Sequence, residues 1–248
     1  VVLITSFLFS CLPMHARPAV AKQIDAEVAP FVRAHHFSGV ILAVDNRKIV
    51  YEKAFGLASA ELNVPNRIDT RFGIASITKL MTGVITNRLL EEQRLRSDDT
   101  VSKYIPGFPN GEKITITILR GHRSGLPHRV TTAAEEAVPY SSAEIVEKIS
   151  HAQPMFEPGA RRLYSSAGFS VLARLLEIAS GESYPQLLKH YVFDPAGMDQ
   201  SLQFDSETIM ERRADEYILS PRGMTVAPRK DYSFLSGAGS VFGTARDV

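Results

Sequence analysis

The stretch that decides the fold of this chain reads Phe72-Gly73-Ile74-Ala75-Ser76-Ile77-Thr78-Lys79-Leu80-Met81-Thr82-Gly83. A serine followed three residues later by a lysine at the start of a helix places the hydroxyl and the amine on one face, one turn apart. A desolvated lysine can be neutral near pH 7 and accept the serine proton. About one Ser-x-x-Lys pair is expected by chance in a chain of this size. Ser76–Lys79 is the only one that the sequence contains, so its surroundings decide its meaning.

The apolar spacing after Ser76 predicts a long helix over residues 76–92. Its inward-facing residues would be Leu80, Val84, Leu89 and Leu90. Ser76 would cap this helix, and Lys79 would lie in its first turn. The helix dipole there favours negative charge, which would help a serine alkoxide to form and lower the pKa of the lysine. The alternative is a solvated helix start with a surface lysine, although the apolar neighbours argue against it.

A second cluster lies in the loop before a predicted apolar helix at residues 167–181. The turn signal Glu157-Pro158-Gly159 leads into Tyr164-Ser165-Ser166. A tyrosine at this point could bring its phenol beside Ser76 and Lys79. A neighbouring ammonium lowers the pKa of a phenol, which suits it to general acid–base catalysis. The alternative is a half-buried packing tyrosine whose hydroxyl is satisfied elsewhere.

The composition is that of an ordinary globular protein. The 248 residues are 44% hydrophobic and 22% charged, which excludes disordered, collagen-like and coiled-coil chains. The net charge is +1 and no basic run occurs, so the sequence carries no electrostatic footprint for nucleic acid. The single cysteine, Cys11, allows neither a disulfide framework nor a cysteine metal site, and the scattered histidines lack a His-x-x-x-His spacing. We therefore expect no metal and no cofactor, and the absence of Gly-x-Ser-x-Gly argues against an α/β-hydrolase.

The first 21 residues resemble a signal peptide. Residues 1–14 are almost wholly apolar, and Ala19-Val20-Ala21 forms an Ala-x-Ala cleavage site before Lys22. The apolar stretch is too short for a membrane span, so no transmembrane segment is expected. Two alternatives remain, which are a buried first helix or strand and a lipoprotein anchored through Cys11. We expect an exported protein of the periplasm or cell envelope, with one domain over residues 22–248.

The rest of the chain predicts one α/β unit without repeats or linkers. Residues 22–37 have helical spacing, and residues 38–44 and 48–55 are expected to form a β-hairpin around a turn at 45–47. Residues 114–120 alternate isoleucine and threonine, which favours a strand, while a helix that overrides this propensity is the alternative. Further helices are expected over residues 142–151, 167–181 and 187–192.

The two clusters, taken in this order, resemble the serine β-lactamase/penicillin-binding-protein superfamily, which includes class C β-lactamases, family VIII esterases, D-alanyl-D-alanine carboxypeptidases and LACTB-type homologues. The resemblance covers nearly the whole chain after the leader. Its further landmarks are the opening hairpin, His122-Arg123-Ser124-Gly125-Leu126-Pro127, Pro158-Gly159, Asp194-Pro195-Ala196-Gly197-Met198 and Gly237-Ala238-Gly239. The superfamily's fold, expected here, is α/β (α+β), an antiparallel sheet flanked by helices with a mostly helical subregion.

The resemblance also assigns roles to the two clusters. Ser76 would be the acyl-accepting nucleophile, and Lys79 the base or proton relay beside it. Tyr164 would take the serine proton, donate it to the leaving group and later help to activate the deacylating water. The backbone N–H of Ser76 would supply half of an oxyanion hole, and each such donor is worth about 3–4 kcal/mol of barrier. The implied activity is that of a serine hydrolase, without a cofactor, on a small-molecule or peptide substrate with an ester, amide or β-lactam carbonyl.

The sequence departs from the superfamily pattern in two places. The second motif is usually Tyr-x-Asn, whereas this chain has Tyr164-Ser165-Ser166. The shorter Ser166 hydroxyl predicts weaker β-lactam recognition and a preference for esters or peptides. The third motif, Lys/His-Thr/Ser-Gly, has no counterpart, and Thr244 and Asp247 are typical of a capping box that opens a helix at the chain end. The late sheet strands are therefore expected to be missing, which predicts an open sheet edge, poor stability and no activity for this chain by itself.

The rival hypothesis is a non-catalytic or truncated homologue that keeps the scaffold and at most binds peptidoglycan-like peptides. Intact Ser76, Lys79 and Tyr164 favour the enzyme, whereas Ser166 and the missing third motif favour the rival. His122 is expected to brace the loop beside the site rather than to perform chemistry.

Overall fold

The computed structural model describes residues 16–221 and 223–248. The chain divides into two compact units, one up to Ile68 and a larger one over Asp69–Val248. All four predicted site residues, Ser76, Lys79, Tyr164 and Ser166, belong to the larger unit. Cys11 and most of the predicted leader lie outside the described residues.

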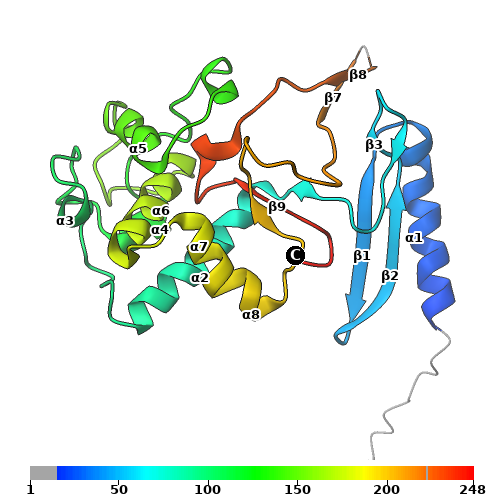
Figure 1. Cartoon of the computed structure of the whole chain (residues 1–248), viewed down its shortest axis with the longest axis horizontal. Helices are drawn as coiled ribbons and strands as arrows, with labels where there is room; N and C mark the ends of the chain where they lie inside the picture. The colour runs from blue at the N-terminus through cyan, green and yellow to red at the C-terminus, as the bar shows by residue number, and fades with distance from the viewer. Residues whose placement is uncertain (1–15, 222) are drawn as a thin grey trace, which may run out of the picture. The chain divides into compact units, whose positions relative to one another are not determined.

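The first unit packs one helix against a β-hairpin. Its elements are α1 (Ala16–Arg33), β1 (Gly39–Asp45), β2 (Lys48–Phe55), β3 (Leu57–Ser59) and β4 (Val64–Pro65). The predicted hairpin is confirmed, and its turn residues Asn46 and Arg47 have φ of 47° and 62°, the left-handed values of a type I′ turn. The helix α1 lies along β2 (Figure 1), where Asp25 accepts hydrogen bonds from Tyr51 Oη at 2.7 Å and Lys53 Nζ at 2.8 Å.

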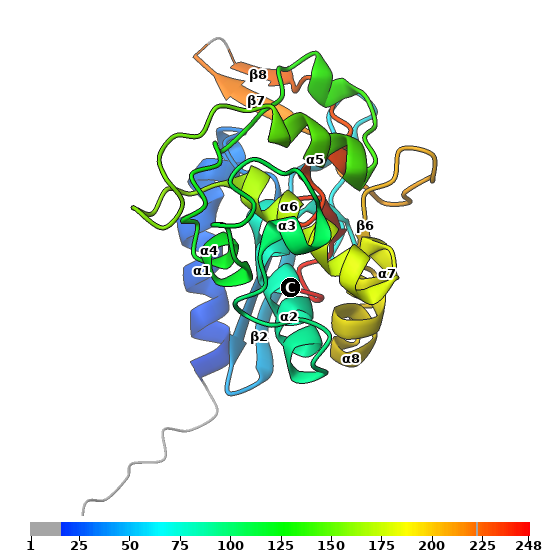
Figure 2. The same cartoon turned by 90° about the vertical axis from the view of Figure 1, so that its left-hand side faces the viewer.

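The larger unit combines a helical region with small antiparallel sheets (Figure 2). Its α-helices are α2 (Thr78–Glu91), α3 (Val101–Tyr104), α4 (Ile116–Arg120), α5 (Ser142–Ser150), α6 (Ser166–Ser180), α7 (Tyr184–Leu188) and α8 (Asp194–Ala196). Shorter turns are the 3₁₀ segments Ala75–Ile77, Glu135–Ala137 and Tyr232–Leu235 and the π-helical segment Lys189–Phe193. Its strands are β5 (Phe72–Gly73), β6 (Leu202–Gln203), β7 (Tyr217–Ser220), β8 (Gly223–Val226) and β9 (Val241–Gly243). The helices predicted over residues 142–151, 167–181 and 187–192 are confirmed to within a few residues.

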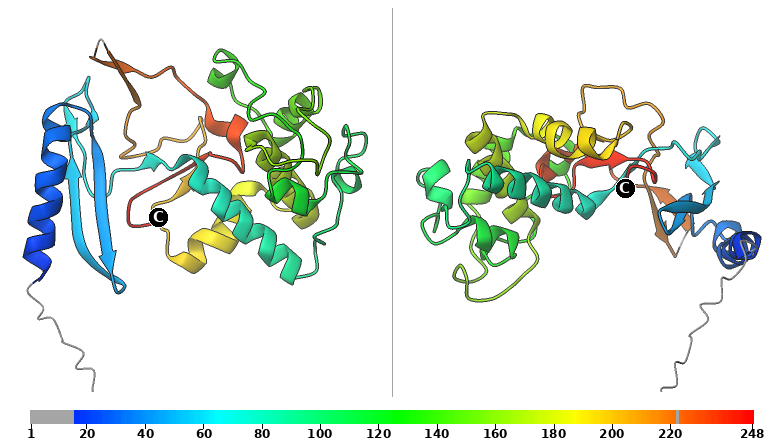
Figure 3. Two further views of the ribbon diagram at one scale, coloured as in Figure 1. Left: turned by 180° about the vertical axis from the view of Figure 1, so that it is seen from behind. Right: turned by 90° about the horizontal axis from the view of Figure 1, so that it is seen from below.

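The helix α6 is the centre of the hydrophobic core. The helices α2, α4, α5 and α7 pack around it (Figure 3). The fully buried side chains contributed by these five helices include Ile85, Leu89, Leu119, Ile145, Ile149, Leu172, Leu175, Leu176 and Leu187. Each such side chain contributes about 1.5–3 kcal/mol when it leaves water. The first turn of α6 is therefore held in place by packing. The loop that precedes α6 thus has a fixed C-terminal end.

A three-stranded antiparallel sheet in the order β5-β9-β6 joins the two ends of this unit. Phe72 pairs with Gly243, and Leu202 pairs with Phe242. Directly after β5, the N–H of Ile74 donates to Val241 O at 3.0 Å. The central strand β9 thus carries the segment 237–240 to the start of α2.

The strand predicted over residues 114–120 is wrong, and the alternative helix is right. Residues 116–120 form α4, whose first N–H groups are capped by Thr115 Oγ1, the acceptor of the Ile118 N–H. Ile116 and Leu119 are fully buried and lie three residues apart, which is helical spacing. Their burial outweighs the β-propensity of alternating isoleucine and threonine.

The helix α2 is confirmed, but the predicted inward face is wrong in part. Leu80 is 72% exposed and Val84 is 42% exposed, whereas Leu89 is fully buried and Leu90 is partly buried. The buried face instead carries Thr78, Lys79, Met81, Thr82, Ile85, Thr86 and Leu89. Several of these are polar, because this face of α2 lines the site described below.

The chain end forms a turn at residues 245–247. Half of the predicted capping box is present, since the Asp247 N–H donates to Thr244 Oγ1 at 3.3 Å. The Asp247 carboxylate accepts instead from the Gln200 N–H at 3.1 Å and from Ser201 Oγ at 2.8 Å. Among the described helices, none has the length and hydropathy that crossing a membrane requires.

Candidate active site

Ser76 lies at the turn between β5 and α2. The chain leaves β5 through Ala75, whose φ of 46° is a left-handed value that residues other than glycine seldom adopt. This turn places Ser76 in a 3₁₀ segment ahead of α2, with the residue exposed. The prediction that Ser76 caps the helix is wrong, because neither the 3₁₀ segment nor α2 receives a side-chain cap bond. Two other side chains bind its hydroxyl instead.

Lys79 is the second residue of α2 and is only 8% exposed. Its ammonium donates three hydrogen bonds, to Ser76 Oγ at 3.3 Å, to Ser166 Oγ at 3.2 Å and to Ala238 O at 2.7 Å. All three donors of the group are therefore used. Burial lowers the pKa of Lys79 below its usual value, and the neighbouring Tyr164 opposes this shift only in part. The lysine is thus buried beneath an exposed serine, with its ammonium in contact with the serine hydroxyl.

Tyr164 reaches the same serine from the loop before α6. Its hydroxyl donates to Ser76 Oγ at 2.7 Å, and the Lys79 ammonium lies 4.8 Å from the centroid of its ring. Burial would raise the pKa of the phenol, but the neighbouring Lys79 and the bond to Ser76 outweigh burial and leave the pKa below its usual value. The structure therefore brings all four predicted residues together, since Ser166 also contacts Lys79.

The loop that carries Tyr164 is tied to the start of α6. Ser165 is the N-cap of this helix, and its Oγ accepts from the Gly168 N–H at 2.9 Å. The same hydroxyl donates to Pro127 O at 2.8 Å in the neighbouring loop. Ser166 is the first helical residue, which aims its side chain at Lys79. The cap therefore sets the positions of the residues on either side of it.

Two histidines lie against Tyr164: His122, which the sequence predicted to brace the loop beside the site, and His128, which it did not predict. The ring of His122 stacks on the Tyr164 ring with centroids 4.6 Å apart and on the Phe169 ring at 5.0 Å. The ring of His128 lies 5.3 Å from the Tyr164 ring. The segment His122–Pro127 was a landmark of the family resemblance, but His128 follows it and carried no recognisable signal.

The carbonyl of Ala238 is held in place by two neighbouring glycines of its segment. Gly237 has a φ of 76°, and its carbonyl accepts from Thr82 Oγ1 of α2 at 2.6 Å. A Cβ at Gly237 would lie 2.7 Å from Phe169 O, so only glycine allows this close approach to α6. At Gly239, a Cβ would lie 3.7 Å from the backbone carbonyl of Ala75. This segment is the third side of the site, opposite Tyr164.

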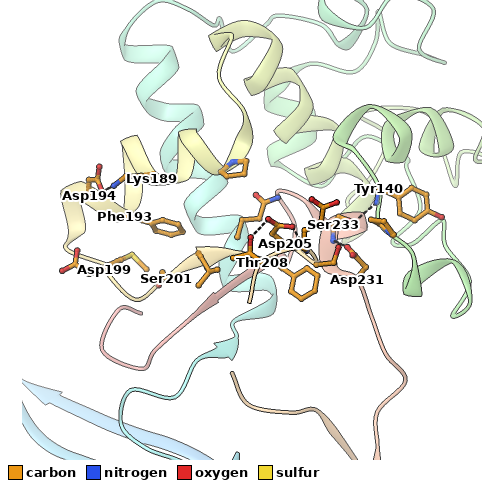
Figure 4. Close-up of a pocket in the computed structure, with 18 residues that line it drawn as sticks. Tyr140, Lys189, Phe193, Asp194, Asp199, Ser201, Asp205, Thr208, Asp231 and Ser233 are labelled. Carbon is orange, nitrogen blue, oxygen red and sulfur yellow. Dashed lines mark hydrogen bonds and ion pairs between the residues drawn. The ribbon is translucent and has the colours of Figure 1, made fainter. Parts of the chain in front are cut away.

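A hollow of about 630 Å³ lies elsewhere in the unit, between α7, α8, β6 and the turn at 232–235 (Figure 4). Its lining includes the ion pair Lys189–Asp194 and the hydrogen bond from Thr208 Oγ1 to Asp205. None of Ser76, Lys79, Tyr164 or Ser166 lines it. Within residues 16–221 and 223–248, no group of three or more histidine, cysteine, aspartate or glutamate side chains is placed to hold a metal ion.

Comparison with known proteins gives the same family as the resemblance seen in the sequence. A family model described as Beta-lactamase matches residues 24–248. A penicillin-binding protein of Bacillus subtilis strain 168 is 32% identical over 183 residues, which are 72% of this chain and 40% of that protein. A teichoic acid D-alanine hydrolase of Staphylococcus aureus strain MRSA252 is 25% identical over 212 residues, 86% of this chain and 52% of that protein. The chain spans about half the length of the curated relatives that it matches.

Solved structures share the fold. The crystal structure of FmtA from Staphylococcus aureus superposes with a TM-score of 0.81 at 23% identity, over 94% of this chain and 64% of that one. The structure of a D-amino acid amidase from Ochrobactrum anthropi SV3 gives a TM-score of 0.80 at 23% identity, over 93% of this chain and 68% of that one. At such identities the likeness establishes the common fold and nothing about substrate.

Proposed function

Because this chain belongs to the Beta-lactamase family and has the α/β fold expected of it, we propose that it is an exported serine hydrolase. The reaction would proceed through an acyl-enzyme on an ester, amide or β-lactam carbonyl. Ser76 would be the nucleophile, Lys79 and Tyr164 would carry its proton, and Ser166 would help to bind the substrate.

The observation that carries this proposal is one exposed hydroxyl with two proton-transfer partners. Ser76 Oγ lies 2.7 Å from Tyr164 Oη and 3.3 Å from Lys79 Nζ. The pKa values of both partners are shifted downward, so the pair can exist as a neutral amine beside a phenol or as an ammonium beside a phenolate. Either form can accept one proton, which is what activation of Ser76 requires.

The geometry supports a reaction in two stages, which are acylation of Ser76 and hydrolysis of the acyl-enzyme. Ser76 Oγ attacks the carbonyl carbon while its proton moves to the Lys79–Tyr164 pair, and the N–H of Ser76 at the start of α2 stabilises the oxyanion. Tyr164 returns the proton to the leaving oxygen or nitrogen as its bond to carbon breaks. Water then attacks the acyl-enzyme, gives a proton to Tyr164 and releases the acid, and Ser76 regains its proton.

The name of one relative supports a substrate that carries a D-amino acid. That relative is a teichoic acid D-alanine hydrolase. Ser166 replaces the asparagine that the family usually has, which weakens the recognition of an amide or β-lactam carbonyl. We therefore favour a small acyl ester, such as that of a D-amino acid, as the substrate class.

The decisive experiment is active-site labelling of the full-length protein. We expect a fluorophosphonate probe to form an adduct that peptide mapping places on Ser76 and that Ser76→Ala abolishes. Ser180→Ala, at the far end of α6, is the matched control and should label normally. A folded protein without an adduct on Ser76 would refute the enzyme hypothesis. Calorimetry with peptidoglycan-like peptides would then test the rival, a scaffold that only binds them.

Export is proposed from the sequence of the first 21 residues. N-terminal sequencing of the mature protein from the envelope fraction should begin at Lys22. A mature protein that keeps residues 1–21 in the cytoplasmic fraction would contradict export.

A further inference from the structure

His122 binds three successive residues of the loop that carries Tyr164. Its carbonyl accepts from the Leu163 N–H at 2.9 Å, its ring stacks on the ring of Tyr164, and its Nδ1 accepts from the Ser165 N–H at 3.2 Å. The residue is 8% exposed and has a φ of 55°. His122 thus binds the loop on both sides of the tyrosine, at Leu163 through its backbone carbonyl and at Ser165 through its imidazole.

His128 continues the same arrangement by one residue. Its Nδ1 accepts from the Ser166 N–H at 3.3 Å. Its ring lies against the ring of Tyr164, which His122 also contacts. The two imidazoles therefore engage Tyr164, Ser165 and Ser166, while the backbone carbonyl of His122 binds Leu163. Tyr164 is left only 41% exposed, with its hydroxyl directed at Ser76.

These hydrogen bonds require neutral imidazoles. A backbone N–H can only donate, so Nδ1 of His122 and of His128 must each carry a lone pair. The proton of each neutral ring is then on Nε2. Protonation of either ring would put a hydrogen on Nδ1, directly facing the N–H that it now accepts from.

The surrounding charges work in the same direction. Burial lowers the pKa of His122, and the cations Lys79 and Arg162 lower it further. Burial also lowers the pKa of His128, followed by Arg129 and Lys79. Of these cations, Arg129 forms an ion pair with Glu136 at 3.1 Å. Lys79 contacts both Ser76 and Tyr164. The neutral forms of His122 and His128 therefore persist to a lower pH than that of an ordinary histidine.

We propose that His122 and His128 are positioning residues that hold the Tyr164 phenol on Ser76 and do so only as neutral imidazoles, so that protonation of either one releases Tyr164. This inference rests on the proposed function, in which Tyr164 carries the serine proton. It assigns part of the loss of activity in acid to these two rings, in addition to protonation of the Lys79–Tyr164 pair.

The test replaces each histidine by asparagine, whose Oδ1 can take the place of Nδ1 but cannot be protonated. Asparagine also tolerates the left-handed backbone of residue 122. We would measure the rate constant of fluorophosphonate labelling of Ser76 between about pH 4.5 and 8.5. In the parent protein, protonation of the imidazoles should add to the fall in rate that protonation of the Lys79–Tyr164 pair causes at the acid end. In the double variant His122→Asn/His128→Asn, only the fall of about tenfold per pH unit that belongs to the pair should remain.

Two further variants separate positioning from mere folding. His122→Phe keeps a ring on Tyr164 but offers no acceptor to the Ser165 N–H, and should label about five- to tenfold more slowly than His122→Asn at pH 8. His151→Asn, on the exposed end of α5, is the matched control and should keep the parent pH profile. An acid fall as steep in the double asparagine variant as in the parent, or equal rates for His122→Phe and His122→Asn, would overturn the proposal.

A spectroscopic measurement distinguishes this failure from failure of the proposed function. The ring resonances of ¹³C-labelled tyrosine, assigned through Tyr164→Phe, should shift with the imidazole titration in the parent and stay constant in the double asparagine variant. If the parent is never labelled but Tyr164 titrates in this way, the hydrolase proposal is wrong and the positioning proposal stands. If the parent is labelled and Tyr164 does not respond, the positioning proposal is wrong.

Discussion

Ser76 Oγ accepts hydrogen bonds from Lys79, three residues away in the sequence, and from Tyr164, 88 residues away. The nearer partner follows from helix geometry, because residues three apart lie on one face. The farther partner depends on the loop before α6 and on the two histidines that hold it. The hydrogen bonding of Ser76 Oγ therefore depends on two separate segments, α2 and the loop before α6, which meet at this atom.

Replacing Tyr164 by phenylalanine should lower the rate of acylation by at least about 100-fold, the usual scale for loss of a general acid–base group. The ring stacking on His122 would remain, so the fold should be kept. The measurement is the rate constant of probe labelling, with thermal unfolding as the control for folding. A near-normal rate would remove Tyr164 from the mechanism.

Replacing Ser166 by asparagine should raise the turnover of amide or β-lactam substrates. An asparagine amide both donates and accepts, so it can bridge Lys79 and a substrate carbonyl, whereas the serine hydroxyl already accepts from Lys79 at 3.2 Å. One added hydrogen bond predicts an increase of about fivefold. Hydrolysis of a chromogenic cephalosporin and of a D-amino acid amide would check this. If neither rate rises, Ser166 does not limit the substrate range.

Among the elements, α2 combines catalytic and structural requirements on one helix. Its buried face carries Lys79 and three threonines, two of which bond back to the helix, from Thr82 Oγ1 to Thr78 O and from Thr86 Oγ1 to Thr82 O. The bond to Thr82 O satisfies the buried Thr86 hydroxyl, and the Thr82 hydroxyl also contacts Gly237 O and Tyr184 Oη. The apolar period of the helix is weakened as a result, because polar residues occupy inward positions.

The same helix carries a glycine that packing does not require. A Cβ at Gly83 meets no atom within 4 Å, and its backbone is helical. Gly83→Ala should therefore raise the free energy of unfolding by about 0.5–1 kcal/mol, since glycine disfavours a helix interior by this amount. The matched control is Gly181→Ala at the end of α6, where space is also free but φ is 74°. That variant should lower stability by about 1 kcal/mol, and denaturant unfolding would check both. A destabilised Gly83→Ala would show that α2 needs the glycine.

At the scale of the whole molecule, the site depends on contacts between segments that lie far apart in the chain. Gly237 O accepts from Thr82 Oγ1, a residue 155 positions away, and the same hydroxyl lies 2.7 Å from the fully buried Tyr184 Oη. The next carbonyl, of Ala238, accepts from Lys79. Loss of these contacts would lower the stability of the protein and remove a hydrogen-bond partner of the Lys79 ammonium.

Gly237→Ala tests that coupling. Its Cβ would lie 2.4 Å from Ala173 Cβ and 2.7 Å from Phe169 O, and its φ of 76° is unfavourable for alanine. We expect a loss of roughly 2–5 kcal/mol of stability from the clash and the backbone strain together, with slower labelling of Ser76. Gly197→Ala, with a φ of 67° and no atom within 4 Å, is the control and should lose only the strain of about 1 kcal/mol. Equal losses of stability in the two variants would mean that α6 moves to make room for the added Cβ. The close approach of residue 237 to α6 would then be unimportant for stability.

Prediction from the sequence succeeded where the signal was local. The pair Ser76–Lys79 and the hairpin depend on spacing and turn chemistry within a few residues. It failed at residues 116–120, where burial overrode an alternating pattern, and at the inward face of α2, where polar site residues replaced apolar ones. His128 was missed because its role depends on a backbone N–H presented by another loop.

The sequence by itself determined the order of the landmarks, the placement of Ser76 one turn from Lys79, and the tyrosine motif, because each is a short pattern whose geometry follows from one helix or one turn. Tertiary structure alone decided which oxygen Tyr164 meets, that Lys79 is buried with Ala238 O as a partner, and that two neutral imidazoles hold the tyrosine loop. The physical reason is that hydrogen bonding and desolvation act through distances of a few ångströms. Those distances are set by how α2, α6 and β9 pack, not by separation along the chain.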